Sequence, residues 1–253
     1  MDLGFWRMIK NFKLIIEYDG TNYHGWQRQK QDRTIQQEIE QALLTMTARQ
    51  VTLNGSGRTD AGVHAFGQVA NFLCETDLSP EVFQKGLGSL LPDDIVIKDC
   101  RLVDESFHAR YDVISKIYHY QILNRKVPTA IGRHYAWFVR RKLDTAAMRS
   151  AISHIIGSHD SKSFEGTGSP RSHTTRHVMA ADLIENNEGS VTFKIEADGF
   201  LRYMVRNIVG TLVDVGLGKV TPAGFKDIQE SKNRSNASAT APAHGLFLME
   251  VRY

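Results

Sequence analysis

The sequence predicts an α+β protein made of two tandem ferredoxin-like halves, each with the element order β-α-β-β-α-β. Strand patterns rich in β-branched residues and helix patterns with 3.6-residue spacing follow one another in this order over residues 12–112 and again over residues 113–253. We expect the halves to share one mostly antiparallel mixed sheet, with the helices on one side and a central cleft. Residues 1–11 are interpreted as an N-terminal lead.

The first half begins with a strand in "FKLIIEYD" at residues 12–19. A helix is expected to open at Thr34, with Gln37 placed to complete a capping box. Its apolar residues share one face: Ile35, Ile39, Ala42, Leu43 and Met46. The remaining elements are expected as a short strand at 51–53, a loop at 55–62, a strand at 63–73, a helix with Ser79 at the N-cap and Pro80 at N1, and a strand at 95–102.

The second half repeats this order at the level of pattern. Its expected elements are a strand at 116–123, a helix at 144–156 capped by Asp144, paired strands at 176–184 and 191–197 around the turn "ENNEG", helices at 202–216 and 221–230, and a last strand in "GLFLMEVRY". The segments 165–175 and 231–244 are rich in Ser, Gly, Asn and Ala, which predicts mobile loops.

The composition is that of a soluble globular protein, with 253 residues, 42% apolar and 23% charged. The start, "MDLGFWRMIKNF", holds only a short apolar piece interrupted by Arg7, too short for a signal-peptide core or a membrane span. Two cysteines, Cys74 and Cys100, lie far apart in the sequence, which argues against a disulfide framework or a zinc site. We expect a cytoplasmic protein without membrane contact.

The positive charge is concentrated in one segment. Between Arg101 and Lys142 there are nine Lys and Arg against three Asp and Glu, a local net charge of +6 in a chain whose net charge is +3. Such a concentration is typical of a face that binds a polyanion, although a solvated basic surface explains a charge run alone equally well.

The stretch "NGSGRTDAGVHAFGQVANF" at residues 54–72 contains a glycine-rich loop. Residues 57–62 have the G-x-x-x-x-G spacing of a phosphate-binding loop, but Val63 and His64 stand where Lys and Ser or Thr are needed. Two interpretations remain. Arg58 and Asp60 either pair or cap within an ordinary turn, or Asp60 is a nucleophile or general base in a loop whose small residues admit a ligand.

Five blocks in order resemble the TruA family of tRNA pseudouridine synthases. They are "GRTDAGVHAFGQV", "FHARYD" at 107–112, "KIYHY" at 116–120, "GFLRYMVRNIVGTLVDVGLGK" at 199–219 and "APAHGLFLMEVRY" at 241–253. The resemblance implies the pseudouridine synthase fold and an isomerase that converts uridine to pseudouridine in the tRNA anticodon stem-loop, at the family's positions 38–40. It also implies that no cofactor is needed.

The resemblance places the family's catalytic aspartate at Asp60. The carboxylate would add to C6 of the ring, attack the ribose or deprotonate it, and the sequence does not choose among these routes. Arg58 matches the arginine that enters the space left by the flipped-out base.

Tyr118 matches the active-site tyrosine, which is expected to pack on the uracil face. The strand pattern alone favours core positions for Tyr118 and Tyr120. Arg206 matches the family's arginine that pairs with the catalytic aspartate, and we expect Arg202 and Arg206 on one side of their helix.

The residues expected to contact RNA are Arg58, Phe107, His108, Arg110, Tyr111, Tyr118, Lys126, Arg140 and Arg171. The expected partners are tRNA and a second copy of the chain, because the family works as a homodimer. His173 and His177 have the spacing of metal ligands but no companion ligand, so no metal is expected.

Two other functions compete with this interpretation. A non-catalytic RNA-binding protein on tandem ferredoxin-like units would keep the basic segment and the aromatic residues but would not need Arg58, Asp60 and Arg206 together. A small-molecule hydrolase or phosphate-binding enzyme would need a metal or a phosphate-binding lysine, and the sequence offers neither.

Overall fold

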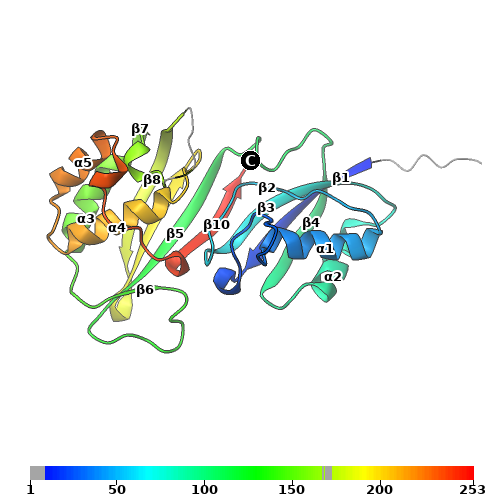
Figure 1. Cartoon of the computed structure of the whole chain (residues 1–253), viewed down its shortest axis with the longest axis horizontal. Coiled ribbons are helices and arrows are strands. Elements are labelled where there is room, and N and C mark those ends of the chain that lie inside the picture. The colour runs from blue at the N-terminus through cyan, green and yellow to red at the C-terminus, as the bar shows by residue number, and fades with distance from the viewer. Residues whose placement is uncertain (1–8, 167, 169–172) are drawn as a thin grey trace, which may run out of the picture. The chain divides into compact units, whose positions relative to one another are not determined.

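The computed structural model describes residues 9–166, 168 and 173–253, and the chain divides into two compact units. The first unit ends at Val113 and also takes in Tyr253, and the second runs from Ile114 to Arg252. Figure 1 shows both units as sheets with helices packed against them. The two units are described in turn.

The first unit contains β1 (Ile9–Tyr18), α1 (Ile35–Thr47), β2 (Asn54–Gly55), β3 (His64–Glu75), α2 (Pro80–Leu90) and β4 (Ile95–Val103). Its strands lie in the order β4-β1-β3-β2 with antiparallel neighbours, which is the ferredoxin-like arrangement. Leu14 in the middle of β1 faces Ala70 of β3 on one side and Cys100 of β4 on the other.

The second unit contains β5 (Ser115–Asn124), β6 (Trp137–Val139), α3 (Thr145–Ile152), β7 (Gly157–Asp160), β8 (Thr175–Glu185), β9 (Ser190–Ala197), α4 (Met204–Gly216), α5 (Pro222–Glu230) and β10 (Leu246–Arg252). The order β10-β5-β9-β8-β7 is antiparallel, and β6 pairs in parallel with β5. Without the short strands β6 and β7, this is again a ferredoxin-like unit.

Six short 3₁₀ turns connect these elements in the described residues: Gly20–Asn22, Ser153–Ile155, Lys162–Phe164, Asn187–Gly189, Arg234–Asn236 and Ala243–Gly245. No helix in the part of the chain that the structure describes is long and apolar enough to cross a membrane.

The α+β prediction is confirmed, and most elements lie where the pattern placed them. The capping box at α1 is wrong: Thr34 is the N-cap, but its hydroxyl makes no cap hydrogen bond and is buried without a partner. The strand expected at 51–53 is also wrong, because β2 is Asn54–Gly55. Leu53 cannot join the sheet, since its N–H donates to Glu40 (3.1 Å) and its carbonyl accepts from Gln36 (3.0 Å).

The segment 231–244, expected to be a mobile loop, is fastened to α4. Asn207 is fully buried, and its side-chain oxygen accepts hydrogen bonds from Arg234 (3.0 Å) and Thr240 (2.7 Å). Gly210 lets the loop approach, since a Cβ there would lie 1.9 Å from the carbonyl oxygen of Ala239. Residues 167 and 169–172 of the other predicted loop lie outside the described residues.

An aromatic cluster forms the centre of the first unit. Phe12 on β1 stacks on Phe72 of β3 with ring centroids 5.2 Å apart, and Phe83 of α2 meets them edge-on at 4.7 and 5.3 Å. All three rings are fully buried, so this cluster fixes α2 against the two strands.

We expect Phe72→Ala to lower the free energy of unfolding by about 3–5 kcal/mol, because it leaves a cavity beside two other rings. The matched control is Leu73→Ala on the opposite face of the same strand, where the side chain is 47% exposed and the cost should not exceed about 1 kcal/mol. Chemical denaturation measures both, and equal losses would contradict this description of the core.

Candidate active site

The glycine-rich loop spans residues 56–63, between β2 and β3 of the first unit. Backbone hydrogen bonds fix both ends of the loop. Ser56 N–H donates to the Val69 carbonyl (2.7 Å), and Val63 N–H donates to the Asp60 backbone carbonyl (3.1 Å). Gly62 has a φ of +78°, which a residue with a side chain rarely adopts. The backbone conformation of the loop is therefore fixed.

Two glycines outside the loop let another segment of the chain press against it. A Cβ at Gly25 would lie 2.4 Å from the carbonyl oxygen of Thr59, and Gly25 itself has a φ of +86°. A Cβ at Gly20 would lie 2.0 Å from the carbonyl oxygen of Val63. Trp26 N–H then donates to Thr59 (3.2 Å). These contacts clamp the backbone on both sides of Asp60.

Buried polar side chains of β1 and β3 form hydrogen bonds to the loop. The hydroxyls of Tyr18 and Thr59 share a hydrogen bond of 2.7 Å. Gln68, fully buried on β3, accepts from the Ser56 hydroxyl (2.6 Å) and donates to the Gly57 carbonyl (3.1 Å). Burial raises the pKa of Tyr18, so its phenol stays protonated and continues to act as a neutral partner.

The Thr59 side chain points inward, and the side chains of its two neighbours, Arg58 and Asp60, therefore lie nearer the surface. The Arg58 side chain is exposed and Asp60 is half-buried. Arg58 Nε donates to the side-chain oxygen of Gln27 (3.0 Å). Gln27 in turn donates to Gln36 of α1 (3.1 Å), and Gln36 donates to Glu40 (3.0 Å). A chain of polar side chains thus connects the Arg58 guanidinium to the first helix.

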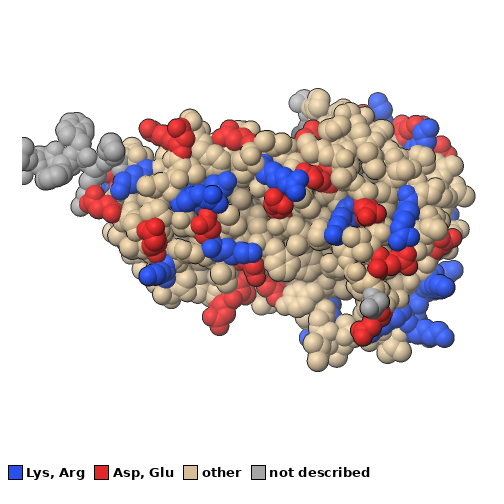
Figure 2. Space-filling view, turned by 180° about the vertical axis from the view of Figure 1, so that it is seen from behind, with Lys and Arg blue, Asp and Glu red and all other residues tan. Residues whose placement is uncertain are grey.

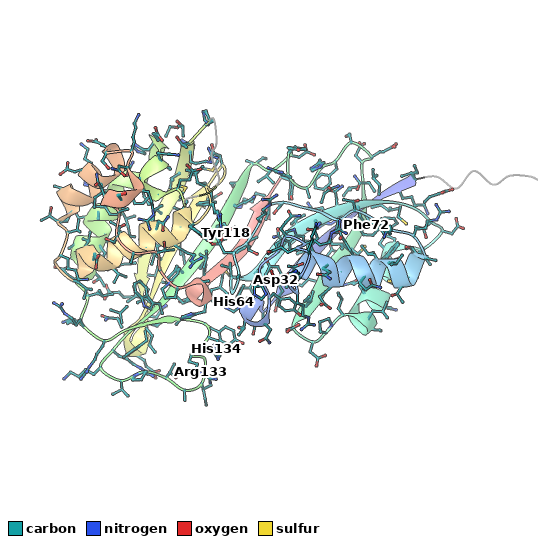
Figure 3. The ribbon with its side chains drawn as sticks, viewed as in Figure 1. Asp32, His64, Phe72, Tyr118, Arg133 and His134 are labelled. Carbon is teal, nitrogen blue, oxygen red and sulfur yellow. The ribbon has the colours of Figure 1, made fainter. Side chains whose placement is uncertain are left out.

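His64, labelled in Figure 3, begins β3 directly after the loop and is buried. Its Nδ1 accepts from Gly20 N–H (3.1 Å) and lies 3.0 Å from a carboxylate oxygen of Asp19. A ring nitrogen cannot accept one hydrogen bond and donate another at once. The Gly20 contact therefore belongs to the neutral ring, and an ion pair with Asp19 belongs to the protonated one.

The predicted RNA-contact segment 107–111 follows β4 in the same unit. Phe107 is half-buried, with its ring 5.0 Å from Tyr253. His108 and Arg110 both lie against the Tyr111 ring, at 4.3 and 5.7 Å, and Tyr111 is 74% exposed. Phe107 therefore has a packing role, while the half-buried His108 and the exposed Arg110 and Tyr111 form a stack at the surface. Their RNA contacts remain predictions.

In the second unit, Tyr118 and Tyr120 lie two residues apart on β5. Tyr120 is fully buried and donates to the Pro242 carbonyl (2.7 Å), and burial raises its pKa. Tyr118, labelled in Figure 3, packs edge-on against Phe200 with centroids 5.0 Å apart. Tyr120 is thus a core residue, as the strand pattern indicated, and the contact of Tyr118 with uracil remains a prediction.

Arg206 lies on the first turn of α4. Its Nε donates to the Ala241 carbonyl (2.8 Å), and its guanidinium lies 5.0 Å from the Tyr203 ring centroid. Arg202 precedes the helix, so the two arginines do not share a helix face as expected. Instead Arg202 reaches the same ring at 4.7 Å and donates to the Tyr203 hydroxyl (2.9 Å). The pairing of Arg206 with Asp60 remains a prediction.

Tyr203 has an unusual backbone. Its φ is +61°, in the left-handed region that residues with side chains rarely occupy. Its ring packs so closely on Gly166 that a Cβ there would lie 2.3 Å away. The strain is consistent with a site where a specific arrangement of side chains is held by the surrounding structure.

The remaining predicted residues divide into two groups. Lys126 and Arg140 lie on the segments that follow β5 and β6 and line one groove. Arg171 lies outside the described residues. Among the residues that the structure does describe, no three His, Cys, Asp or Glu side chains come together as a metal site, and both cysteines are free and buried.

Comparison with known proteins identifies the family. The family model described as tRNA pseudouridine synthase matches residues 14–112 and 151–253. These segments include the loop with Arg58 and Asp60, the stack at 108–111 and Arg206. Tyr118, Lys126 and Arg140 lie between them. The chain belongs to the tRNA pseudouridine synthase family.

Curated relatives match over almost the whole chain. A tRNA pseudouridine synthase A of Acetivibrio thermocellus is 47% identical over 245 residues, which cover 97% of this chain and all of the relative. One of Clostridium acetobutylicum is 45% identical with the same coverage. Among solved structures, an archaeal box H/ACA sRNP Nop10-Cbf5 complex matches 80% of this chain and 44% of that chain, with 12% identity and a TM-score of 0.34, too low to support any argument.

Several supporting residues were missed from the sequence. Gly20, Gly25 and Gln27 stand in "YDGTNYHGWQRQ", between the first expected strand and the first expected helix. Two glycines beside aromatic residues are a sign of close backbone contact, but what they contact is more than thirty residues away. Tyr203 gave no local signal, because its strain depends on the packing against Gly166.

We expect Gly25→Ala to loosen the loop, since its Cβ would collide with the Thr59 carbonyl and its φ is unfavourable for alanine. The free energy of unfolding should fall by about 1–3 kcal/mol, and the Trp26 amide hydrogen should exchange faster. The control is Gly88→Ala in α2, where a Cβ meets nothing within 4 Å and helix propensity should add about 0.5–1 kcal/mol. An unchanged exchange rate at Trp26 in Gly25→Ala would contradict the clamp.

Proposed function

We propose that this protein isomerises uridine to pseudouridine in tRNA, with Asp60 as the residue that performs the chemistry. The observation that carries the proposed reaction is membership of the tRNA pseudouridine synthase family. Relatives called tRNA pseudouridine synthase A align over 97% of the chain. A protein that only binds RNA is not favoured by this match.

The reaction moves bonds within one nucleotide. The N1–C1′ bond breaks, the uracil turns while it is held, and C5 bonds to C1′. The proton on C5 then leaves and N1 takes up a proton, so the product is an isomer of the substrate. This chemistry calls for a nucleophile or base beside the ribose and the ring, and for a group that accepts the C5 proton.

Asp60 suits the first role because of where the loop holds it. Thr59 is tied by its carbonyl to Trp26 and by its hydroxyl to Tyr18, so the backbone of the next residue is fixed. Ala61 and Gly62 follow, and neither has a side chain that would obstruct a nucleotide. A carboxylate in this place is compatible with three routes: addition to C6, attack on the ribose, and deprotonation of the ribose.

Arg58 suits a role in opening the RNA. Its exposed guanidinium is planar and makes a hydrogen bond to Gln27 (3.0 Å) that leaves most of its donors for a ligand. A uridine in a stem-loop must leave the stack before it can react. We propose that Arg58 stacks in the vacated space or binds a neighbouring phosphate.

The finer features of the resemblance are part of the proposal. They are modification at the family's positions 38–40 of the anticodon stem-loop, a homodimer, and a cytoplasmic location. The absence of cysteine pairs close in sequence supports the last of these. The surface stack of His108, Arg110 and Tyr111 supports RNA contact, because aromatic and guanidinium planes stack on bases.

We expect Asp60→Asn to bind unmodified tRNA with nearly unchanged affinity and to form no pseudouridine, because the amide is neither a nucleophile nor a base. Wild type should form pseudouridine without an added cofactor. Pseudouridine mapping on the product tRNA measures both. The control is Asp93→Asn, an exposed carboxylate outside the loop that removes the same charge.

Two results would change the proposal. Pseudouridine formation by Asp60→Asn would show that another residue performs the chemistry. If wild type binds tRNA but modifies none of its uridines, the protein is a non-catalytic RNA-binding protein and the second candidate replaces the first.

We also expect Tyr203 to act through Arg206 as a positioning residue. Loss of the ring in Tyr203→Ala should lower the single-turnover rate at saturating tRNA by roughly 2- to 30-fold, the range of one cation–π contact of about 0.5–2 kcal/mol. Tyr203→Phe keeps the ring and should keep most of the rate. If both variants lose the rate equally, or neither does, the ring does not position Arg206.

A further inference from the structure

A groove of about 400 Å³ lies in the second unit, and neither Tyr118 nor Arg206 lines it. It is lined by the end of β5 and the residues after it, by the segment that follows β6, and by the turn between β8 and β9. Four of its lining residues are basic: Arg125, Lys126, Arg140 and Lys142. Figure 2 shows Lys and Arg side chains gathered at the lower right, at one end of this unit.

The positive charge of the groove is only partly neutralised by its own residues. Within residues 9–166, 168 and 173–253, Lys126, Arg140 and Lys142 form no salt bridge within 4.0 Å and no side-chain hydrogen bond, and Lys142 has only a longer-range attraction to Glu185. Arg125 donates to the backbone carbonyls of Val127 (2.8 Å) and Pro128 (3.2 Å). Four cations beside a single carboxylate repel one another on balance, and a bound polyanion would relieve that repulsion.

The one acidic lining residue does not cancel this charge. Glu185 accepts a hydrogen bond from Arg149 (2.9 Å), a residue of α3. Hydrogen bonds from Thr145 and Arg149 lower the pKa of Glu185, so it stays ionised and engaged with α3. Its single negative charge is shared between Arg149 and Lys142, so the positive charge of the groove remains in excess.

The groove has a rigid frame. The Asn124 side chain donates to the carbonyls of Val139 (2.8 Å) and Arg141 (2.6 Å) and accepts from Leu143 N–H (3.0 Å). These bonds fix the backbone on both sides of Arg140 and Lys142 against the end of β5. Gly189, with a φ of +79°, lets the β8–β9 turn close onto the Asn124 carbonyl, since a Cβ would lie 2.4 Å from that oxygen.

We propose that this groove binds the phosphodiester backbone of tRNA, as a contact that positions the substrate and takes no part in the chemistry. The proposal rests on the proposed function for the identity of the polyanion. Arginine forks and lysine ammonium groups are the side chains that bind phosphate best, and the volume equals that of about a dozen water molecules at ~30 Å³ each. All four cations lie in the segment 113–150, which the family model does not match.

The test is the triple variant Lys126→Ala/Arg140→Ala/Lys142→Ala, with unmodified tRNA as the probe and the dissociation constant measured over a series of salt concentrations. Each lost phosphate contact should reduce the slope of log K against log salt by about 0.7–0.9, so the slope should fall by about 2–3. Affinity near 0.1 M salt should fall roughly tenfold or more. At tRNA concentrations below saturation, the rate of pseudouridine formation should fall in proportion to the lost affinity.

The matched control is Lys219→Ala/Lys226→Ala/Lys232→Asn, which removes the same charge from the same unit. These lysines pair with Asp214 (2.7 Å), Glu230 (3.7 Å) and Asp160 (3.3 Å). Asparagine is used at Lys232 because φ there is +51°. The control should keep most of the affinity and the slope.

Wild-type tRNA affinity and salt slope in the groove variant would overturn the proposal. An equal loss of affinity in the control would also overturn it, because the effect would then be one of net charge. Weaker tRNA binding with a lower saturating rate would also overturn it, since the groove would then take part in the chemistry. Absence of pseudouridine from wild type would reject the proposed function, and the binding measurements would still decide whether the groove binds RNA.

Discussion

The contact between the backbone of Gly25 and the carbonyl of Thr59 is the constraint on which the candidate active site depends. A side chain at Gly25 would overlap the Thr59 oxygen, so the segment after β1 can press against the loop only with glycine there. That pressure brings the Trp26 amide to Thr59 and places Gln27 beside Arg58. The position of the Arg58 side chain and of the backbone at Asp60 therefore follows from one close approach of two backbones.

The second unit uses the same principle at two places. Gly210 admits the loop 231–244 to within contact of α4, and the buried Asn207 then holds it through Arg234 and Thr240. Gly166 leaves room for the Tyr203 ring. The strained backbone of Tyr203 places this ring against Arg202 and Arg206. In each case a residue without a side chain permits a contact, and polar side chains then make it specific.

The sequence predicted what local pattern controls. Long alternating strands such as β1 and β5 and the apolar face of α4 were predicted correctly, because their periodicity is set by burial on one side. The three-residue β6 and the four-residue β7 are too short to show a period, and β2 is placed by its pairing with Asn71 and Ala70 of β3. The candidate loop was recognised, but its supports were not: Gly25 and Gln27 act on residues more than thirty positions away.

The central claim is that a clamped loop holds Asp60 ready to act on a uridine. The most direct measurement is the single-turnover rate of pseudouridine formation by Gly25→Ala at saturating tRNA, with the tRNA affinity of the same variant measured beside it. The account predicts a rate at least roughly tenfold lower, the effect of a loss of about 1.4 kcal/mol in transition-state stabilisation, with affinity nearly unchanged. A wild-type rate in a variant whose Trp26 amide exchanges rapidly would show that the reaction does not depend on the clamp.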